Sequence, residues 1–218
     1  MKDDKRLIVS FILNALVFLL VLAGTIVMVV VKSEELSESS LAAFKYFTFQ
    51  SNIFMGIIAL IYGYYQFLQI KGKIEKIPQN LGIFNLIATS AVALTFIIVV
   101  VFLAPGYGYD KMYKNANLFF HGIVPVVAIV NYLVFTRSER YRFQLTLLSI
   151  IPSFLYGLVY FIVVVSLNGY GNLKIDFYLF GKDGPFIGAL YYLAVMAIAY
   201  CLSLILFFGN RLVFKKSK

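Results

Sequence analysis

Two short segments hold most of the side chains that could carry out chemistry. One runs from Lys45 to Asn52 and contains Thr48, and the other runs from Asn117 to Pro125 and contains His121, the chain's single histidine. A threonine hydroxyl becomes a nucleophile when a neighbouring base takes its proton, and histidine is the side chain that titrates near neutral pH. Thr48 is therefore a candidate nucleophile and His121 its candidate base.

Amide and hydroxyl groups near this pair could support the same chemistry. Helical spacing places Ser51 and Asn52 on the face of Thr48, and Asn117 on the face of His121. These three side chains could stabilise an oxyanion or orient the imidazole. The alternative is a packing role, in which Thr48 bonds a backbone carbonyl while His121 and Asn117 bridge helices.

The helical face that carries Thr48 continues deeper into its segment through three further residues, Met55, Ala59 and Gln66, whereas Gln50 points elsewhere. Pro125 lacks an N–H and cannot donate to the carbonyl of His121. We expect the helix to be weakened or kinked there, with a polar pocket beside the imidazole.

Other chemistries find little support. Cys201 is the single cysteine, so an intramolecular disulfide is excluded, and a lone thiol with no nearby His or acid is more typical of packing. One His and one Cys cannot supply three or four zinc ligands. There is no phosphate-cradling glycine loop or G-x-S-x-G elbow, so we expect no metal and no cofactor.

The elements that must position these residues are membrane helices. Apolar residues make up 61% of the 218 and charged residues only 13%, which is far outside the range of a soluble domain. Six uncharged runs have the length needed to cross a hydrocarbon core roughly 30 Å thick, and they do not alternate as barrel strands do. The sequence predicts an all-α, polytopic, single-domain bundle with spans at 7–31, 46–70, 81–103, 118–135, 145–165 and 185–208.

The basic residues predict the orientation of the bundle. Of the 19 Lys and Arg, thirteen lie on the side that holds both termini, and six lie on the other side. Because cytoplasmic loops are enriched in Lys and Arg, we expect both termini in the cytoplasm. The basic side then contacts anionic membrane lipids, and its scattered charges do not form a nucleic-acid site. In this topology Thr48 and His121 both lie about 3 to 5 Å below the outer ends of their helices, so they can meet.

The fifth span carries a polar stripe on an otherwise apolar helix, formed by Thr146, Ser149, Ser153, Tyr156 and Tyr160. Close helix packing with interhelical hydrogen bonds is the interpretation we favour for it. Tyr160 reaches the outer third of the membrane, and Tyr191 and Tyr192 lie at a similar depth in the sixth span. These three tyrosines are candidates for lining a substrate pocket, and the alternative for Tyr191 and Tyr192 is an interfacial aromatic belt.

The segment from Lys45 to Phe49, the pair Asn117 and His121, and the six short-looped spans resemble the family of the androgen-induced protein and the androgen-dependent TFPI-regulating protein, which has bacterial members. The architectural match covers nearly the whole chain, and the motif match covers some fifteen residues. The chain departs from the animal pattern after His121, where Gly122 to Pro125 contain no hydroxyl residue.

This resemblance implies a membrane-embedded threonine hydrolase of fatty acid esters of hydroxy fatty acids or related lipids, with Thr48 as nucleophile and His121 as base. A different class of function is also open: a non-enzymatic binding or transport subunit, such as the substrate-capture component of a vitamin importer, which can also have six helices. The excess of Lys over Arg and the many Ile residues indicate an AT-rich bacterial genome, and hence a plasma membrane.

Overall fold

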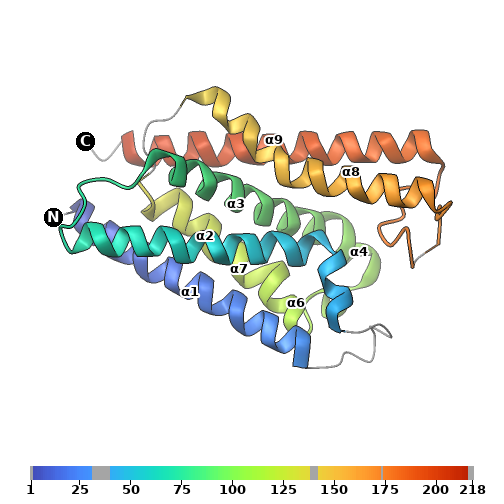
Figure 1. Cartoon of the computed structure of the whole chain (residues 1–218), viewed down its shortest axis with the longest axis horizontal. Helices are drawn as coiled ribbons and strands as arrows, with labels where there is room; N and C mark the ends of the chain where they lie inside the picture. Colours follow the sequence, from blue (N-terminus) through green and yellow to red (C-terminus); the bar gives the residue numbers. More distant parts are fainter. Residues whose placement is uncertain (1, 31–39, 138–141, 173, 216–218) are drawn as a thin grey trace.

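The computed structural model describes residues 2–30, 40–137, 142–172 and 174–215, and in these ranges it contains helices and turns but no strand. Six of its helical segments are long and apolar enough to cross a membrane: Asp4–Val30, Phe47–Ile70, Gln79–Tyr107, Ala116–Phe135, Phe143–Ser166 and Pro185–Phe214. The prediction of an all-α, six-span membrane protein is confirmed. The two ends of the chain lie at the same end of the bundle (Figure 1), as an even number of crossings requires.

Three spans consist of several helical pieces, and the elements in chain order are as follows. The first two spans and the connection between them are α1 (Lys2–Val30), the 3₁₀ helix η1 (Ser40–Lys45) and α2 (Phe47–Ile70). The third span and the loop after it are α3 (Gln79–Ile98), the π-helix η2 (Val99–Leu103), α4 (Ala104–Tyr107) and α5 (Tyr109–Met112). The fourth is α6 (Ala116–Leu118), π-helix η3 (Phe119–Ile123), α7 (Val124–Val130) and π-helix η4 (Asn131–Phe135). The last two are the 3₁₀ helix η5 (Phe143–Ile150) with α8 (Ile151–Ser166), and α9 (Pro185–Lys215).

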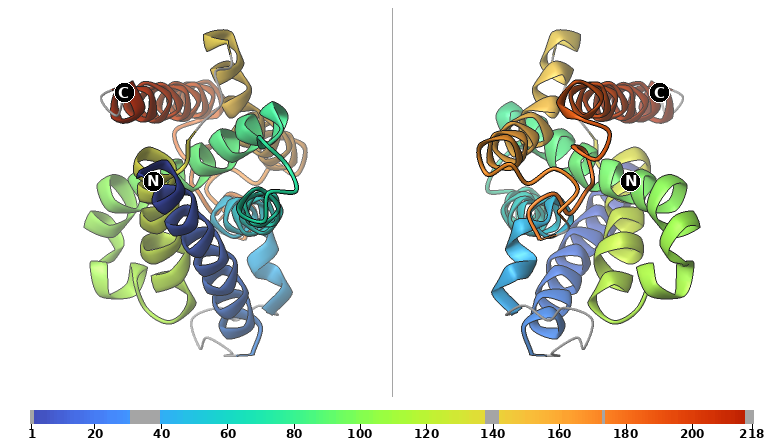
Figure 2. Two further views of the ribbon diagram at one scale, coloured as in Figure 1. Left: turned by 90° about the vertical axis from the view of Figure 1, so that its left-hand side faces the viewer. Right: turned by 90° about the vertical axis from the view of Figure 1, so that its right-hand side faces the viewer.

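A buried apolar cluster holds the first four spans together. Its members are Val17, Val21, Met55, Ile58, Ala59, Ala88, Val92, Val124 and Ala128, from α1, α2, α3 and α7. Small residues allow the helices to approach closely, and a Cβ on Gly56 of α2 would lie only 2.8 Å from Cγ1 of Val21 on α1. The end-on views in Figure 2 show α8 and α9 lying together on one side of these four spans.

Large apolar side chains on α8 and α9 point away from the bundle. Leu155, Val159 and Ile162 of α8 and Leu193 and Ile205 of α9 are each more than half exposed. In water such a surface would drive aggregation, but lipid tails are as apolar as these side chains. The exposed surface is therefore the lipid-facing surface of the membrane protein.

Buried polar side chains join α1, α2 and the fourth span near the end that holds the termini. Gln66 of α2 accepts from Nδ2 of Asn14 at 2.7 Å and donates to the hydroxyl of Ser10 at 2.8 Å. Asn131 donates to Oδ1 of Asn14 at 3.0 Å, and the Ser10 hydroxyl lies 3.0 Å from that of Thr136. These partners satisfy one another inside the membrane, so the cluster ties three spans together.

Candidate functional site

Thr48 lies in the first turn of α2, at the end of the bundle opposite the chain termini. The face predicted for it is confirmed, because Ser51, Asn52 and Gln66 are buried while Gln50 is exposed and donates to the carbonyl of Phe44. The side chain of Thr48 is partly exposed. Its hydroxyl makes no hydrogen bond with any residue that the structure describes, so the bond to a backbone carbonyl that the packing alternative assumed is not formed.

His121 lies on a π-helical turn, η3, and Pro125 explains its five-residue hydrogen-bond spacing. The N–H of Val124 donates to the carbonyl of Phe119, five residues back. Since Pro125 cannot donate to the carbonyl of His121, the helix widens over these residues instead of continuing a regular α-helical ladder. The predicted weakening beside the imidazole therefore takes the form of a π turn.

The imidazole is buried, with 8% of His121 exposed, and its Nδ1 lies 2.6 Å from the carbonyl oxygen of Met112. A carbonyl can only accept, so Nδ1 carries the proton, and in the neutral ring Nε2 is the nitrogen with a free lone pair. Tyr113 meets the ring edge-on, with centroids 6.4 Å apart. Partial burial, and then the neighbouring Tyr109, raise the pKa of Tyr113, which keeps this phenol protonated beside the imidazole.

Asn52 joins the two candidate segments. Its Nδ2 donates to the carbonyl of Thr48 at 2.7 Å and to the carbonyl of Phe120 at 3.1 Å. Because one nitrogen reaches both carbonyls, the backbone of Thr48 lies beside the residue that precedes His121. Asn52 is fully buried, and its Oδ1 is enclosed without a hydrogen-bond partner. Such an orphan acceptor is uncommon in a folded interior.

The other two residues predicted to support the site, Ser51 and Asn117, differ in the hydrogen bonds that their side chains make. Ser51 donates to the carbonyl of Thr48 at 3.1 Å, and its hydroxyl lies 3.1 Å from that of Thr95 on α3. Asn117, one turn before His121, has a partly exposed side chain with no hydrogen bond to any described residue. No hydrogen bond joins Thr48 to His121 in the described part of the chain.

The loop between α8 and α9 packs on the start of α2. Its Asp176 is fully buried and accepts from the hydroxyl of Tyr160 at 2.6 Å and from the N–H of Gly181 at 2.9 Å. The Tyr160 hydroxyl in turn accepts from the N–H of Tyr178 at 2.9 Å, and the hydroxyl of Tyr178 accepts from the N–H of Phe47 at 3.1 Å. Burial raises the pKa of Tyr178 to about 12, so this phenol is neutral where it meets the backbone beside Thr48.

Of the three tyrosines predicted to line a pocket, Tyr160 alone is tied to the start of α2, through this loop. Tyr191 is exposed and donates to Asp183 at 3.2 Å. Tyr192 donates to the carbonyl of Phe154 at 2.7 Å, and its ring occupies the space that a side chain on Gly157 would need. Tyr192 therefore packs between α8 and α9.

The predicted packing role of the fifth-span stripe is confirmed. The hydroxyl of Ser203 on α9 donates to Oγ of Ser149 at 2.9 Å, and Ser153 lies 3.7 Å from the sulfur of Met196. The hydroxyl of Tyr156 donates to the carbonyl of Lys45 at 2.6 Å, just before α2. The stripe thus connects α8 to α9 and to the segment that carries Thr48.

The sequence did not predict the roles of Met112, which accepts a hydrogen bond from His121, and Asp176, which accepts one from Tyr160. Met112 contributes a backbone carbonyl, which has no signature in a sequence, and Asp176 resembled any other acidic loop residue. No group of three His, Cys, Asp or Glu side chains in the described ranges could hold a metal ion. A cavity lies at the opposite end of the bundle, between Gln66 and Phe214, far along α2 from Thr48.

No protein-family model, no curated protein and no solved structure matches the chain. The arguments about the candidate site therefore rest on its own geometry. The resemblance seen in the sequence stays a prediction.

Proposed function

We propose that the chain is a membrane-embedded hydrolase of lipid esters, with Thr48 as the nucleophile and His121 as the base. The observation that carries the proposal is the hydrogen bond from Nδ1 of His121 to the Met112 carbonyl, on a π turn held against the start of α2. This bond leaves Nε2 as the proton acceptor and fixes the plane of the ring, which is what a general base requires.

The reaction needs only these side chains and water. Nε2 of His121 takes the proton of the Thr48 hydroxyl while the threonine oxygen bonds to the ester carbonyl carbon. The tetrahedral intermediate collapses, the bond to the alkoxy oxygen breaks, and His121 returns the proton to the leaving alcohol. Water, deprotonated by the same nitrogen, then attacks the acyl-threonine and releases the fatty acid and the original hydroxyl.

The supporting residues take different parts in this mechanism. Both protons of the Asn52 amide are used on backbone carbonyls, and Ser51 is bonded to Thr48 and Thr95, so these two hold the site in shape. Asn117 has a carboxamide without a partner among the described residues, and it is the side chain left to donate to the oxyanion. The Thr48–His121 hydrogen bond forms when substrate binds, since such bonds are often long in a free enzyme.

A lipid substrate suits the place of the site in the bundle. Thr48 lies in the first turn of a membrane-spanning helix, where the ester groups of lipids meet the polar boundary. The substrates proposed are fatty acid esters of hydroxy fatty acids or related lipid esters, in a bacterial plasma membrane. Tyr160 is linked to this end of α2 through Tyr178, whose hydroxyl accepts from the N–H of Phe47.

A series of variants tests the nucleophile. Thr48→Val keeps the shape of the side chain and removes its hydroxyl, so it should fold, fail to react with a fluorophosphonate probe and lose roughly three or more orders of magnitude in ester hydrolysis. Thr48→Ser should keep measurable activity. Ser51→Ala is the matched control, because it removes a neighbouring hydroxyl one turn further along the same face.

The possible outcomes separate the two classes of function. If Thr48→Val reacts and turns over like the wild type while Ser51→Ala is inactive, Ser51 is the nucleophile. If neither substitution changes labelling or the lipids of expressing cells, the hydrolase proposal is wrong, and the binding or transport subunit becomes the better description.

A further inference from the structure

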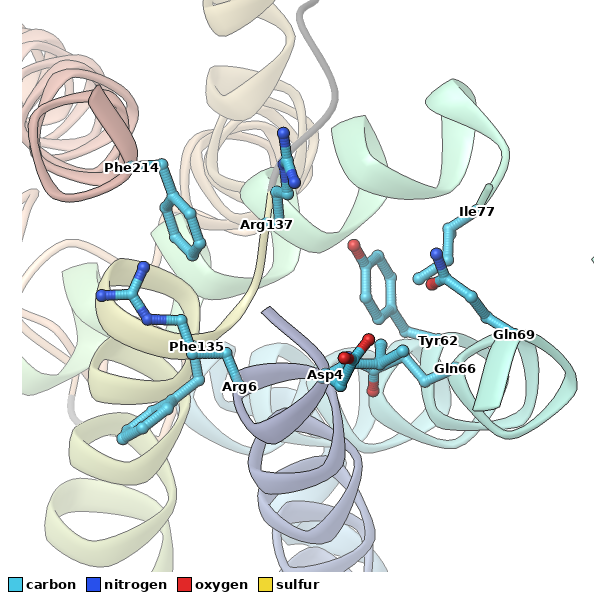
Figure 3. Close-up of a pocket in the computed structure, with 10 residues that line it drawn as sticks. Asp4, Arg6, Tyr62, Gln66, Gln69, Ile77, Phe135, Arg137 and Phe214 are labelled. Atoms are coloured by element: carbon cyan, nitrogen blue, oxygen red, sulfur yellow. The ribbon is translucent and has the colours of Figure 1, made fainter. Parts of the chain in front are cut away.

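A cavity of about 130 Å³ opens at the end of the bundle that holds the chain termini. At about 10 to 15 Å³ for each water on this scale, it has room for several water molecules and hence for a polar head group. It lies between the beginning of α1 and the ends of α2, η4 and α9. Figure 3 shows Arg6 and Phe214 on one side of the cavity and Tyr62, Gln66 and Gln69 on the other.

Arg6 lines this cavity and has a guanidinium nitrogen that lacks a hydrogen-bond acceptor, which a bound anion could supply. The residue is partly buried, and its Nη1 is enclosed without a hydrogen-bond partner. Its guanidinium lies over the ring of Phe214, 4.9 Å from the centroid, and forms no ion pair with any residue that the structure describes. A cation–π contact supplies no acceptor for the guanidinium protons, and a partly buried charge without an acceptor is unfavourable.

The remaining wall fits a phosphate group at the membrane surface. Arg137 brings a second guanidinium, and Asp4 is the acidic residue of the wall. The amides of Gln66 and Gln69 line the cavity, but each already donates within the protein, to the Ser10 hydroxyl and to the Glu75 carbonyl. Arginine is the side chain best matched to phosphate, through its planar set of donors. The ends of four spans meet here, which is the depth at which lipid head groups lie.

We infer that this cavity binds the phosphate of a phospholipid head group, with Arg6 as its main donor. The site is separate from Thr48 and His121, which lie at the other end of the bundle, and it does not depend on the hydrolase proposal. Free inorganic phosphate offers the same chemistry, so the experiment must distinguish the two sources.

Binding can be followed by native mass spectrometry of the detergent-solubilised protein. The three probes are dioctanoyl phosphatidylglycerol, dioctanoylglycerol and inorganic phosphate. Arg6→Gln should weaken binding of the phospholipid at least about tenfold, the loss expected for one hydrogen-bonded charge. Arg142→Gln is the matched control, since Arg142 is an exposed arginine outside the cavity, and it should bind like the wild type.

Each outcome decides the inference. Preference for the phospholipid over dioctanoylglycerol, lost in Arg6→Gln alone, supports a lipid head-group site. Equally tight, Arg6-dependent binding of inorganic phosphate supports the same site with free phosphate as the ligand. Equal binding by wild type and Arg6→Gln, or no preference for the phosphate-bearing lipid, overturns the inference.

A measurement on the wild-type protein covers the case in which Arg6→Gln does not fold. Phenylglyoxal modifies accessible arginines, and the modified peptides can be quantified by mass spectrometry. Dioctanoyl phosphatidylglycerol should protect Arg6 from modification and leave Arg142 as reactive as before. Unchanged modification of Arg6 in the presence of the lipid would count against the site.

Discussion

Replacing Tyr160 with phenylalanine should release the loop between α8 and α9 from the start of α2. The hydroxyl of Tyr160 donates to the buried carboxylate of Asp176 and accepts from the N–H of Tyr178. Without it both groups lose a partner in a buried setting. A hydrogen bond to a charged group contributes about 1.5 to 3 kcal/mol, and one between neutral groups, such as that from the N–H of Tyr178, about 0.5 to 1.5 kcal/mol. We expect opening of the loop to become about 2 to 4 kcal/mol easier.

Hydrogen exchange measures this opening directly. The amides of Gly171 and Gly181 donate to Asp176, so they exchange when the loop opens. At 1.4 kcal/mol for each factor of ten, their protection should fall by about 30- to 700-fold in Tyr160→Phe. The amide of Phe47, which donates to Tyr178, should lose protection with them.

Tyr191→Phe is the matched control for this experiment. It removes the same hydroxyl from a Tyr–Asp pair, but Tyr191 is exposed and its bond to Asp183 competes with water. Protection of Gly171 and Gly181 should stay at the wild-type level. Unchanged exchange in Tyr160→Phe, or an equal loss in both variants, would refute the view that the buried pair holds the loop in place.

Three further predictions concern topology, catalysis and stability. A reporter fused after Lys218 should be cytoplasmic and one inserted near Gly171 external, so finding both on one side would overturn the six-span topology. His121→Ala should fold and lose most ester hydrolysis in a turnover assay, and a folded, fully active variant would exclude His121 as the base. Gln66→Leu should lower the free energy of unfolding by about 1 to 3 kcal/mol, because it leaves Asn14 and Ser10 on α1 without this buried partner. Gln69→Leu removes only an exposed hydrogen bond and should change the free energy of unfolding little. Similar losses in both variants would contradict the role of the buried cluster.

The spans could be predicted because hydropathy is a local property. The expected span at 46–70 agrees with Phe47–Ile70, and the one at 118–135 differs from Ala116–Phe135 by two residues at one end. The largest difference is at the end of the chain, where the predicted span stops at residue 208 and the apolar helix continues to Phe214. A helix can extend into the aqueous boundary as long as its backbone is bonded internally, so the end of the apolar run does not end the helix.

The candidate site could be predicted only in part. Helical periodicity correctly placed Ser51 and Asn52 on a buried face, and Pro125 correctly marked an irregular turn at His121. The sequence could not show that Nδ1 of His121 bonds the carbonyl of Met112, because any residue type supplies a carbonyl. Nor could it show that Asn52 donates both amide protons to backbone carbonyls.

The sequence by itself determined that this chain lies in a membrane, where its six spans begin and which faces of them are polar. These features follow from composition and from the 3.6-residue period of a helix, and both depend only on residues that are near one another in the sequence. The tertiary structure decided which polar groups meet: Asn52 with the backbone before His121, Asp176 with Tyr160, and Gln66 with Ser10 and Asn14. Such partners come from distant parts of the chain, and a buried polar group takes whichever partner the packing of the helices brings within hydrogen-bond distance.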